Sequence, residues 1–182
     1  MTGRGGIEAL LGLMDEAFDG AGIEASNESQ ALLTNLATVA DDQWRARPAG
    51  VTRTIESIAL HVGACKVMYD DYAFGPGTLQ FGTSAVEPWG PDGPAPIDEV
   101  RAWLLSTYAQ LRGHVAALPD DTQLDVARRT NWGEHRPTRW IVAAMITHDA
   151  YHAGEINHLR SLLGTDDRWR WQQFEDPSGS AG

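Results

Sequence analysis

The chain has 182 residues, and 25 acidic against 14 basic side chains give it a formal net charge of −11 with histidine neutral. Its length fits one domain, and a hydrophobic fraction of 42% with 21% charged residues is typical of a folded globular protein. Because an acidic surface repels phosphate backbones and anionic lipids, we expect neither a nucleic acid nor a membrane as the partner.

Five stretches carry apolar residues at the three- and four-residue spacing of an amphipathic helix. In chain order they cover residues 7–19, 27–40, 53–72, 97–117 and 138–163. The first is predicted to be a short leading helix, and the other four are predicted to form the body of the protein. Residues 41–44 are expected to add one more turn after the second stretch.

Two segments between these helices are predicted to be irregular. Residues 75–96 hold five prolines and five glycines in 22 positions, which is too long for a simple connector and predicts a lid or an excursion packed back on the body. Residues 120–137 are expected to be irregular around a turn at 131–133. No segment alternates between apolar and polar residues as a strand would, so the sequence predicts an all-α fold, a four-helix bundle with a long crossover loop.

The ends of the chain and its single cysteine indicate where the protein works. We expect one domain over residues 1–175 and a flexible tail over residues 176–182, whose sequence DPSGSAG is typical of a linker. Acidic residues interrupt the apolar N-terminal stretch, so we expect neither a signal peptide nor a membrane span. Cys65 is the only cysteine, so the fold does not depend on an oxidising compartment, and the expected location is the cytoplasm.

A pair of histidines on the last predicted helix indicates a metal site. His148 and His152 stand four residues apart in HDAYHAGEINHLR, which places both on one helix face about 6 Å apart along the axis. Two imidazoles so placed can both bind one metal ion, although such pairs are more often surface or hydrogen-bonded pairs. Glu155 lies on the same face, whereas His158 points elsewhere. The chain has no HExxH motif, so nothing indicates a zinc protease.

The third ligand has to come from another helix, and His61 is the best candidate. It lies in IALHVGACK among apolar residues, so we expect it to face the core, where an unpaired imidazole is costly and a shared metal would relieve the cost. Cys65 follows four residues later on the same face. It could be a ligand or a nucleophile, but a lone buried cysteine is usually a small packed hydrophobe.

These residues resemble the DinB family of helical bundles over about residues 27–171. The likeness rests on ALHVGACKVMYDDYAFG (residues 59–75), on the RTNWGE turn (129–134), and on TRWIVAAMITHDAYHAGEINHLRSLLG (138–164). It implies up-down-down-up topology with one long crossover, a homodimer, and a divalent metal ion, zinc or alternatively nickel or iron. Carried over by position, the ligands would be His61, His148 and His152.

The resemblance also implies an activity. Several members are thiol S-transferases that use bacillithiol or mycothiol. A related isomerase branch has Glu where this chain has His148, which argues against isomerase activity here. We therefore expect transfer of mycothiol to an electrophilic small molecule through a metal-bound thiolate, and the arginine-rich composition, with Lys66 as the only lysine, favours that thiol. The alternatives are a hydrolase that uses metal-bound hydroxide, a small-molecule binding or resistance protein without activity, and a purely structural metal.

Several further residues are candidates for the same site. Glu155 is predicted to be catalytic, either by orienting His152 or as a base, unless it merely bonds Arg160 or the backbone. The candidate substrate-binding residues are Trp89, Trp132, Tyr151 and Arg139, and Arg136 is a further candidate for binding a carboxylate. The remaining tryptophans are expected to pack, Trp103 and Trp140 in the core and Trp169 and Trp171 along the C-terminal segment.

Overall fold

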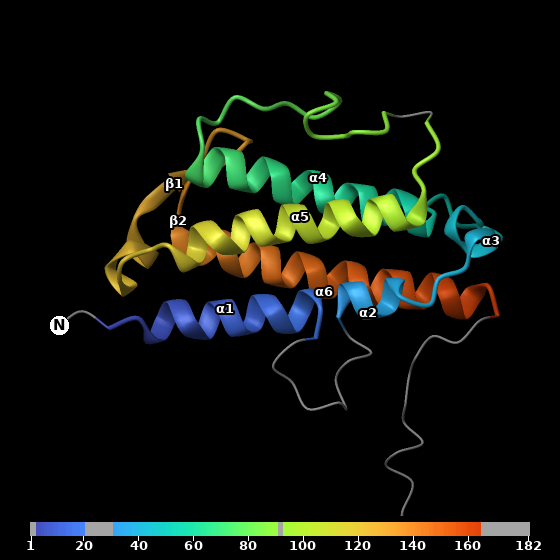
Figure 1. Ribbon diagram of the computed structural model, residues 1–182, viewed down its shortest axis with the longest axis horizontal. Coiled ribbons are helices and arrows are strands. Elements are labelled where there is room, and N and C mark those ends of the chain that lie inside the picture. Colours follow the sequence, from blue (N-terminus) through green and yellow to red (C-terminus); the bar gives the residue numbers. More distant parts are fainter. Residues whose placement is uncertain (1–2, 21–30, 91–92, 165–182) are drawn as a thin grey trace, which may run out of the picture.

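Four long helices lie side by side in the computed structural model, which describes residues 3–20, 31–90 and 93–164 (Figure 1). They are α1 (Gly5–Phe18), α4 (Ile55–Phe74), α5 (Ile97–Ala116) and α6 (Thr138–Leu162). Two short helices, α2 (Leu32–Leu36) and α3 (Asp41–Trp44), connect α1 to α4. The prediction of an all-α fold is confirmed.

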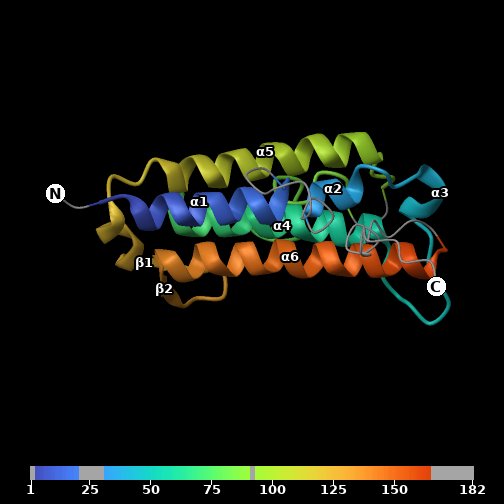
Figure 2. The same cartoon turned by 90° about the horizontal axis from the view of Figure 1, so that it is seen from below.

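The directions of the helices confirm the up-down-down-up topology. In Figure 1, α1 and α6 run one way and α4 and α5 the other, and the loop after α4 returns along the whole bundle before α5 begins. In the view from below, α1 lies between α5 and α6, with α4 behind it (Figure 2). The long crossover is therefore the proline- and glycine-rich segment over residues 75–96.

The helix predicted over residues 27–40 is much shorter than expected, and residues 27–30 lie outside the described part of the chain. Thr34 Oγ1 and Asn35 Nδ2 both donate hydrogen bonds to the carbonyl of Ala31, and such side-chain bonds compete with regular helix. The amide of Ala37 is shared between two carbonyls at the end of α2. Helix α2 therefore covers five residues only and continues the line of α1 along α6 (Figure 1). The predicted leading helix, α1, accounts for most of the first helix position of the bundle.

A small β-hairpin interrupts the segment that was predicted to be irregular. After a 3₁₀ turn (Asp121–Asp125), strand β1 (Ala127–Arg129) pairs antiparallel with β2 (His135–Pro137). Gly133 has a φ of 90° in the connecting turn, a conformation that glycine adopts at little cost. Strands of three residues are too short to show an alternating pattern, and for this reason the sequence did not reveal them.

The start of α4 is determined locally. Thr54 Oγ1 accepts a hydrogen bond from the amide of Ser57, and Ser57 Oγ accepts one from the amide of Thr54, at 3.0 Å each. This reciprocal pair satisfies two amides that the first turn would leave without partners. The cap determines that α4 begins at Ile55. The helix period then determines which residues of α4 share a face.

A buried ion pair joins α4 to α6 inside the bundle. Lys66 Nζ lies 2.5 Å from each carboxylate oxygen of Asp149, and the two side chains are 1% and 3% exposed. The rings of Phe18 and Tyr108 lie 5.1 and 5.8 Å from the ammonium group. The only lysine of the chain is therefore enclosed between helices.

Not every predicted core residue is buried. Trp103 packs against the core as expected, but Trp140 is 41% exposed, so its prediction as a core residue is wrong. It lies on the outer side of α6, where its ring contacts Trp132 of the hairpin turn and the guanidinium of Arg136. The predicted roles of Trp169 and Trp171, and the tail, lie outside the described residues. Within the described residues, none of the helices has the length and apolar character needed to cross a bilayer.

Candidate metal centre

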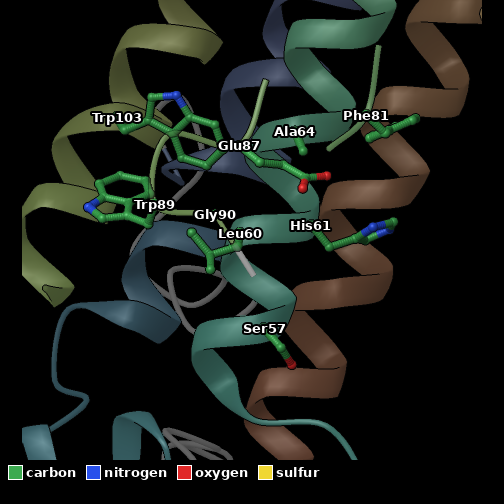
Figure 3. Close-up of a pocket in the computed structure, with 9 residues that line it drawn as sticks. All are labelled: Ser57, Leu60, His61, Ala64, Phe81, Glu87, Trp89, Gly90 and Trp103. Atoms are coloured by element: carbon green, nitrogen blue, oxygen red, sulfur yellow. The ribbon is translucent and has the colours of Figure 1, made fainter. Parts of the chain in front are cut away.

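Three imidazoles from two helices converge at the groove between α4 and α6. The ring centroid of His61 lies 5.1 Å from that of His148 and 5.1 Å from that of His152, and the latter two are 4.4 Å apart. His61 points from α4 toward α6 (Figure 3). The structure thus brings together all three residues that the resemblance named as ligands.

His61 is exposed, so the prediction that it faces the core is wrong. Its apolar neighbours in the sequence do not share its face, because successive residues of a helix point about 100° apart. Val62 is fully buried, whereas His61 itself is turned toward the surface groove. A metal ion bound there would be accessible from outside the bundle.

The donor atoms lie at distances that suit a shared metal ion. His148 Nε2 is 3.2 Å from His61 Nε2, and Cys65 Sγ is 3.7 Å from the same nitrogen. Donor atoms of these three residues all lie within 4.8 Å of one another. With metal–nitrogen bonds of about 2.05 Å and a metal–sulfur bond of about 2.3 Å, tetrahedral ligand atoms lie about 3.3 Å (N–N) and about 3.6 Å (N–S) apart. The group therefore fits a divalent metal ion.

The surroundings of the two nitrogens of His148 support the same interpretation. His148 Nδ1 is buried and has no hydrogen-bond partner among the residues that the structure describes. Its other nitrogen faces a second imidazole nitrogen at 3.2 Å, and two lone pairs at that distance repel each other unless a proton or a cation lies between them. A metal ion between the two Nε2 atoms would relieve this repulsion without requiring a charged imidazolium, and Nδ1 of His148 would then carry the proton.

The protonation states suit metal binding. Burial, reinforced by the neighbouring His152 and His61, lowers the pKa of His148 to about 3. Although the His61 side chain is exposed, partial desolvation of its ring lowers its pKa, with His152 and Arg53 acting in the same direction. Both imidazoles are therefore neutral near pH 7, the form that binds metals. Burial raises the pKa of the Cys65 thiol to about 11, so this group is protonated until a cation coordinates it.

A carboxylate orients the third imidazole. His152 Nδ1 lies 2.8 Å from Glu155 Oε2, and since a carboxylate only accepts, Nδ1 carries the proton and Nε2 keeps its lone pair for a metal. Glu155 Oε1 in turn accepts a hydrogen bond of 2.9 Å from Arg53 Nη1 at the start of α4. Because both oxygens are engaged, these contacts favour the orienting role of Glu155 over that of a base. The arginine that bonds Glu155 is Arg53, not Arg160, the alternative considered from the sequence.

Cys65 is the residue whose importance the sequence underestimated. The resemblance named His61, His148 and His152, whereas the donor atoms that meet most closely belong to His61, Cys65 and His148. The spacing of four residues from His61 already placed Cys65 on the right face. What the spacing could not show is that α6 brings His148 to the same point, so that donor atoms of His61, Cys65 and His148 gather within 4.8 Å of one another.

Two cavities adjoin the cluster, and His61 borders both of them. The first cavity has a volume of about 270 Å³ and lies between α4, α5 and the crossover loop (Figure 3). The other cavity, of about 260 Å³, lies toward α6 and is lined by Arg53, Ser57, Ile58, His61 and His152. The first is lined by Ser57, Leu60, His61, Ala64, Phe81, Glu87, Trp89, Gly90 and Trp103. A small molecule in either cavity could therefore reach the cluster.

The predicted substrate-binding residues are not all in these cavities. Trp89 lines the cavity beside α5. Tyr151 is 66% exposed, with its ring centroid 4.9 Å from that of His152. Trp132 contacts Tyr69 and Trp140 at the hairpin, away from both sets of lining residues. Arg139 is paired with Asp125, as Arg136 is with Glu134, so these two arginines already bind carboxylates of their own chain.

Helical bundles build metal sites from side chains on facing helices, and the imidazoles between α4 and α6 form a candidate site of this kind. In the comparison with protein families, the model of the DinB superfamily matches residues 24–156. The chain belongs to the DinB superfamily, as the resemblance indicated. Among curated proteins, none matches the chain significantly.

Proposed function

We propose that this protein is a metal-dependent enzyme that transfers a low-molecular-weight thiol to an electrophilic small molecule. The observation that carries the proposal is the convergence of three imidazoles and a thiol at the border of two cavities. A purely structural metal would not need this access, because closed sites serve stability while catalytic sites keep a position open to substrate.

Some residues of the site would bind the metal ion, and one would orient a ligand. His61, His148 and His152 would hold a divalent metal ion, zinc in the first place and nickel or iron otherwise, with Cys65 as the further donor. A metal ion bound there would supply a Lewis acid that lowers the pKa of a thiol or of water. Glu155 keeps His152 in the tautomer that can coordinate.

The thiol proposed as the cosubstrate is mycothiol. Support for it comes from the arginine-rich composition and from the family. Water in place of the thiol would make the same site a hydrolase, and the experiment below separates the two activities. The homodimer implied by the family belongs to the proposal as well, and light scattering of the purified protein tests it.

The test begins with the metal. Untagged protein should contain about one equivalent of a divalent metal by elemental analysis, and His148→Ala should lose it. The control is His158→Ala, because His158 is exposed on the same helix and takes no part in the cluster. Retention of one equivalent by His148→Ala would refute the assigned ligands.

The activity is tested with mycothiol and a model alkylating electrophile. Metal-loaded protein should consume both, and a chelator should abolish turnover while leaving the far-ultraviolet circular dichroism largely unchanged. Consumption of the electrophile without thiol would favour the hydrolase. No turnover in the presence or absence of thiols, with one metal still bound, would refute the catalytic proposal.

A further inference from the structure

We infer that the cavity between α4, α5 and the crossover loop binds a small molecule through a positively charged ammonium group, which Glu87 and the surrounding aromatic rings recognise. The inference rests on the proposed function, because it gives the chemical class of that enzyme's substrate. The residues that would recognise the cation, Glu87 and the aromatic rings, are not metal ligands, so the two proposals can fail separately.

Glu87 is the carboxylate of this cavity. Among the described lining residues it is the only acidic one, and none is a lysine or an arginine. Its side chain is half-buried, and its carboxylate forms no hydrogen bond or ion pair with any residue in the described part of the chain. A carboxylate that is partly removed from water gains from a cationic partner. A ligand that fills the cavity therefore gains most if it places a cation beside Glu87.

Three aromatic rings, those of Phe81, Trp89 and Trp103, also line the cavity. Trp89 and Trp103 meet edge to face, with ring centroids 5.4 Å apart and an interplanar angle of 84°. Figure 3 shows Glu87 reaching over α4, with these two rings on one side and Phe81 and His61 on the other. The faces of indole rings attract cations. A carboxylate beside several aromatic rings is the combination that recognises an alkylammonium group.

Close packing holds this wall in place. A Cβ added at Gly63 would lie 2.1 Å from the ring of Trp103, so the indole rests directly on the backbone of α4. Trp89 Nε1 donates a hydrogen bond of 3.4 Å to Glu99 at the start of α5. The rings are therefore positioned before a ligand arrives, which lowers the entropic cost of binding.

Charge and size narrow the ligand further. Arg53 lines the other cavity, where it is paired with Glu155, so it does not neutralise Glu87. The net charge of −11 also favours cations over anions. A volume of about 270 Å³ corresponds to roughly nine water molecules at about 30 Å³ each. This suits a compact amine or quaternary ammonium compound whose other end reaches His61.

The test compares choline with its uncharged isostere, 3,3-dimethylbutan-1-ol, by isothermal titration calorimetry on the metal-loaded and the chelator-treated protein. Choline should bind at least about tenfold more tightly than the isostere, because only choline gains from the carboxylate and the rings. Glu87→Gln should remove most of this preference. Glu8→Gln should retain it, because Glu8 is an exposed residue of α1 and the substitution changes the charge by the same amount.

Each outcome decides between the alternatives. Equal affinity for the two compounds, no saturable binding of choline, or an unchanged preference in Glu87→Gln would overturn the inference. Loss of metal from Glu87→Gln would also overturn it, because Glu87 would then belong to the metal centre. Choline binding to protein that cannot retain metal would uphold the inference while the proposed function fails.

Discussion

Replacing Lys66 with methionine should reduce the free energy of unfolding by about 3–5 kcal/mol, because it leaves the carboxylate of Asp149 buried without its partner. The ammonium group lies 2.5 Å from both oxygens. Neither side chain is more than 3% exposed, so water cannot replace the lost partner. Burial already raises the pKa of Asp149, which shows that the surroundings penalise its charge.

The magnitude follows from two opposing contributions. At 2.5 Å and an effective dielectric constant of about 20, two unit charges attract by about 6–7 kcal/mol. Removing the two ions from water costs several kcal/mol each. The net contribution of the ion pair to the free energy of unfolding is therefore close to zero. Each single substitution is costly because it removes the attraction but leaves the other charged group buried. Replacing both partners removes both contributions.

The assay is urea unfolding followed by circular dichroism on chelator-treated Lys66→Met, Asp149→Leu and the double variant. Each single variant should lose about 3–5 kcal/mol, and the double variant should lie within about 2 kcal/mol of the original protein. Arg136→Met removes one partner of an exposed pair with Glu134 and should cost less than about 1 kcal/mol. Additive losses in the double variant, or single losses below about 1 kcal/mol, would refute this reasoning.

Three further predictions concern the metal centre and the pH dependence of stability. Cobalt-loaded protein should show a thiolate-to-cobalt charge-transfer band that Cys65→Ser lacks; a spectrum without this band in the original protein would exclude the sulfur as a ligand. Glu155→Gln should weaken metal affinity about 10- to 100-fold in equilibrium dialysis because His152 loses its orienting acceptor, whereas Glu134→Gln should leave the affinity unchanged, and equal affinities would contradict the orienting role. The hydrogen bonds from Arg112 lower the pKa of Asp15, so their contribution to stability is complete above the ordinary pKa of about 3.8 and disappears as the pH falls through the lower, folded-state value. Asp15→Asn should therefore be less stable than the original protein at neutral pH and should lose this difference toward pH 2, as measured by thermal unfolding; a difference independent of pH would contradict this assignment.

The long helices could be predicted because their signals are local. The period of apolar residues, the cap at Thr54 and the glycine or proline at the helix ends placed α1, α4, α5 and α6 within about two residues of their observed bounds. The second predicted helix was too long because α2 ends at Leu36, where the amides of Ala37 and Val39 donate to carbonyls three residues earlier. These bonds do not appear in an apolar period.

The sequence by itself determined that His148 and His152 share one helix face, because a spacing of four residues is a property of the helix alone. Tertiary structure decided the rest of the site. It turned His61 outward and aligned α4 against α6 so that Cys65 meets His148. It also folded the crossover loop back to place Glu87 among indole rings. These residues lie far apart along the chain, so their meeting depends on how the helices pack and on the course of the loop.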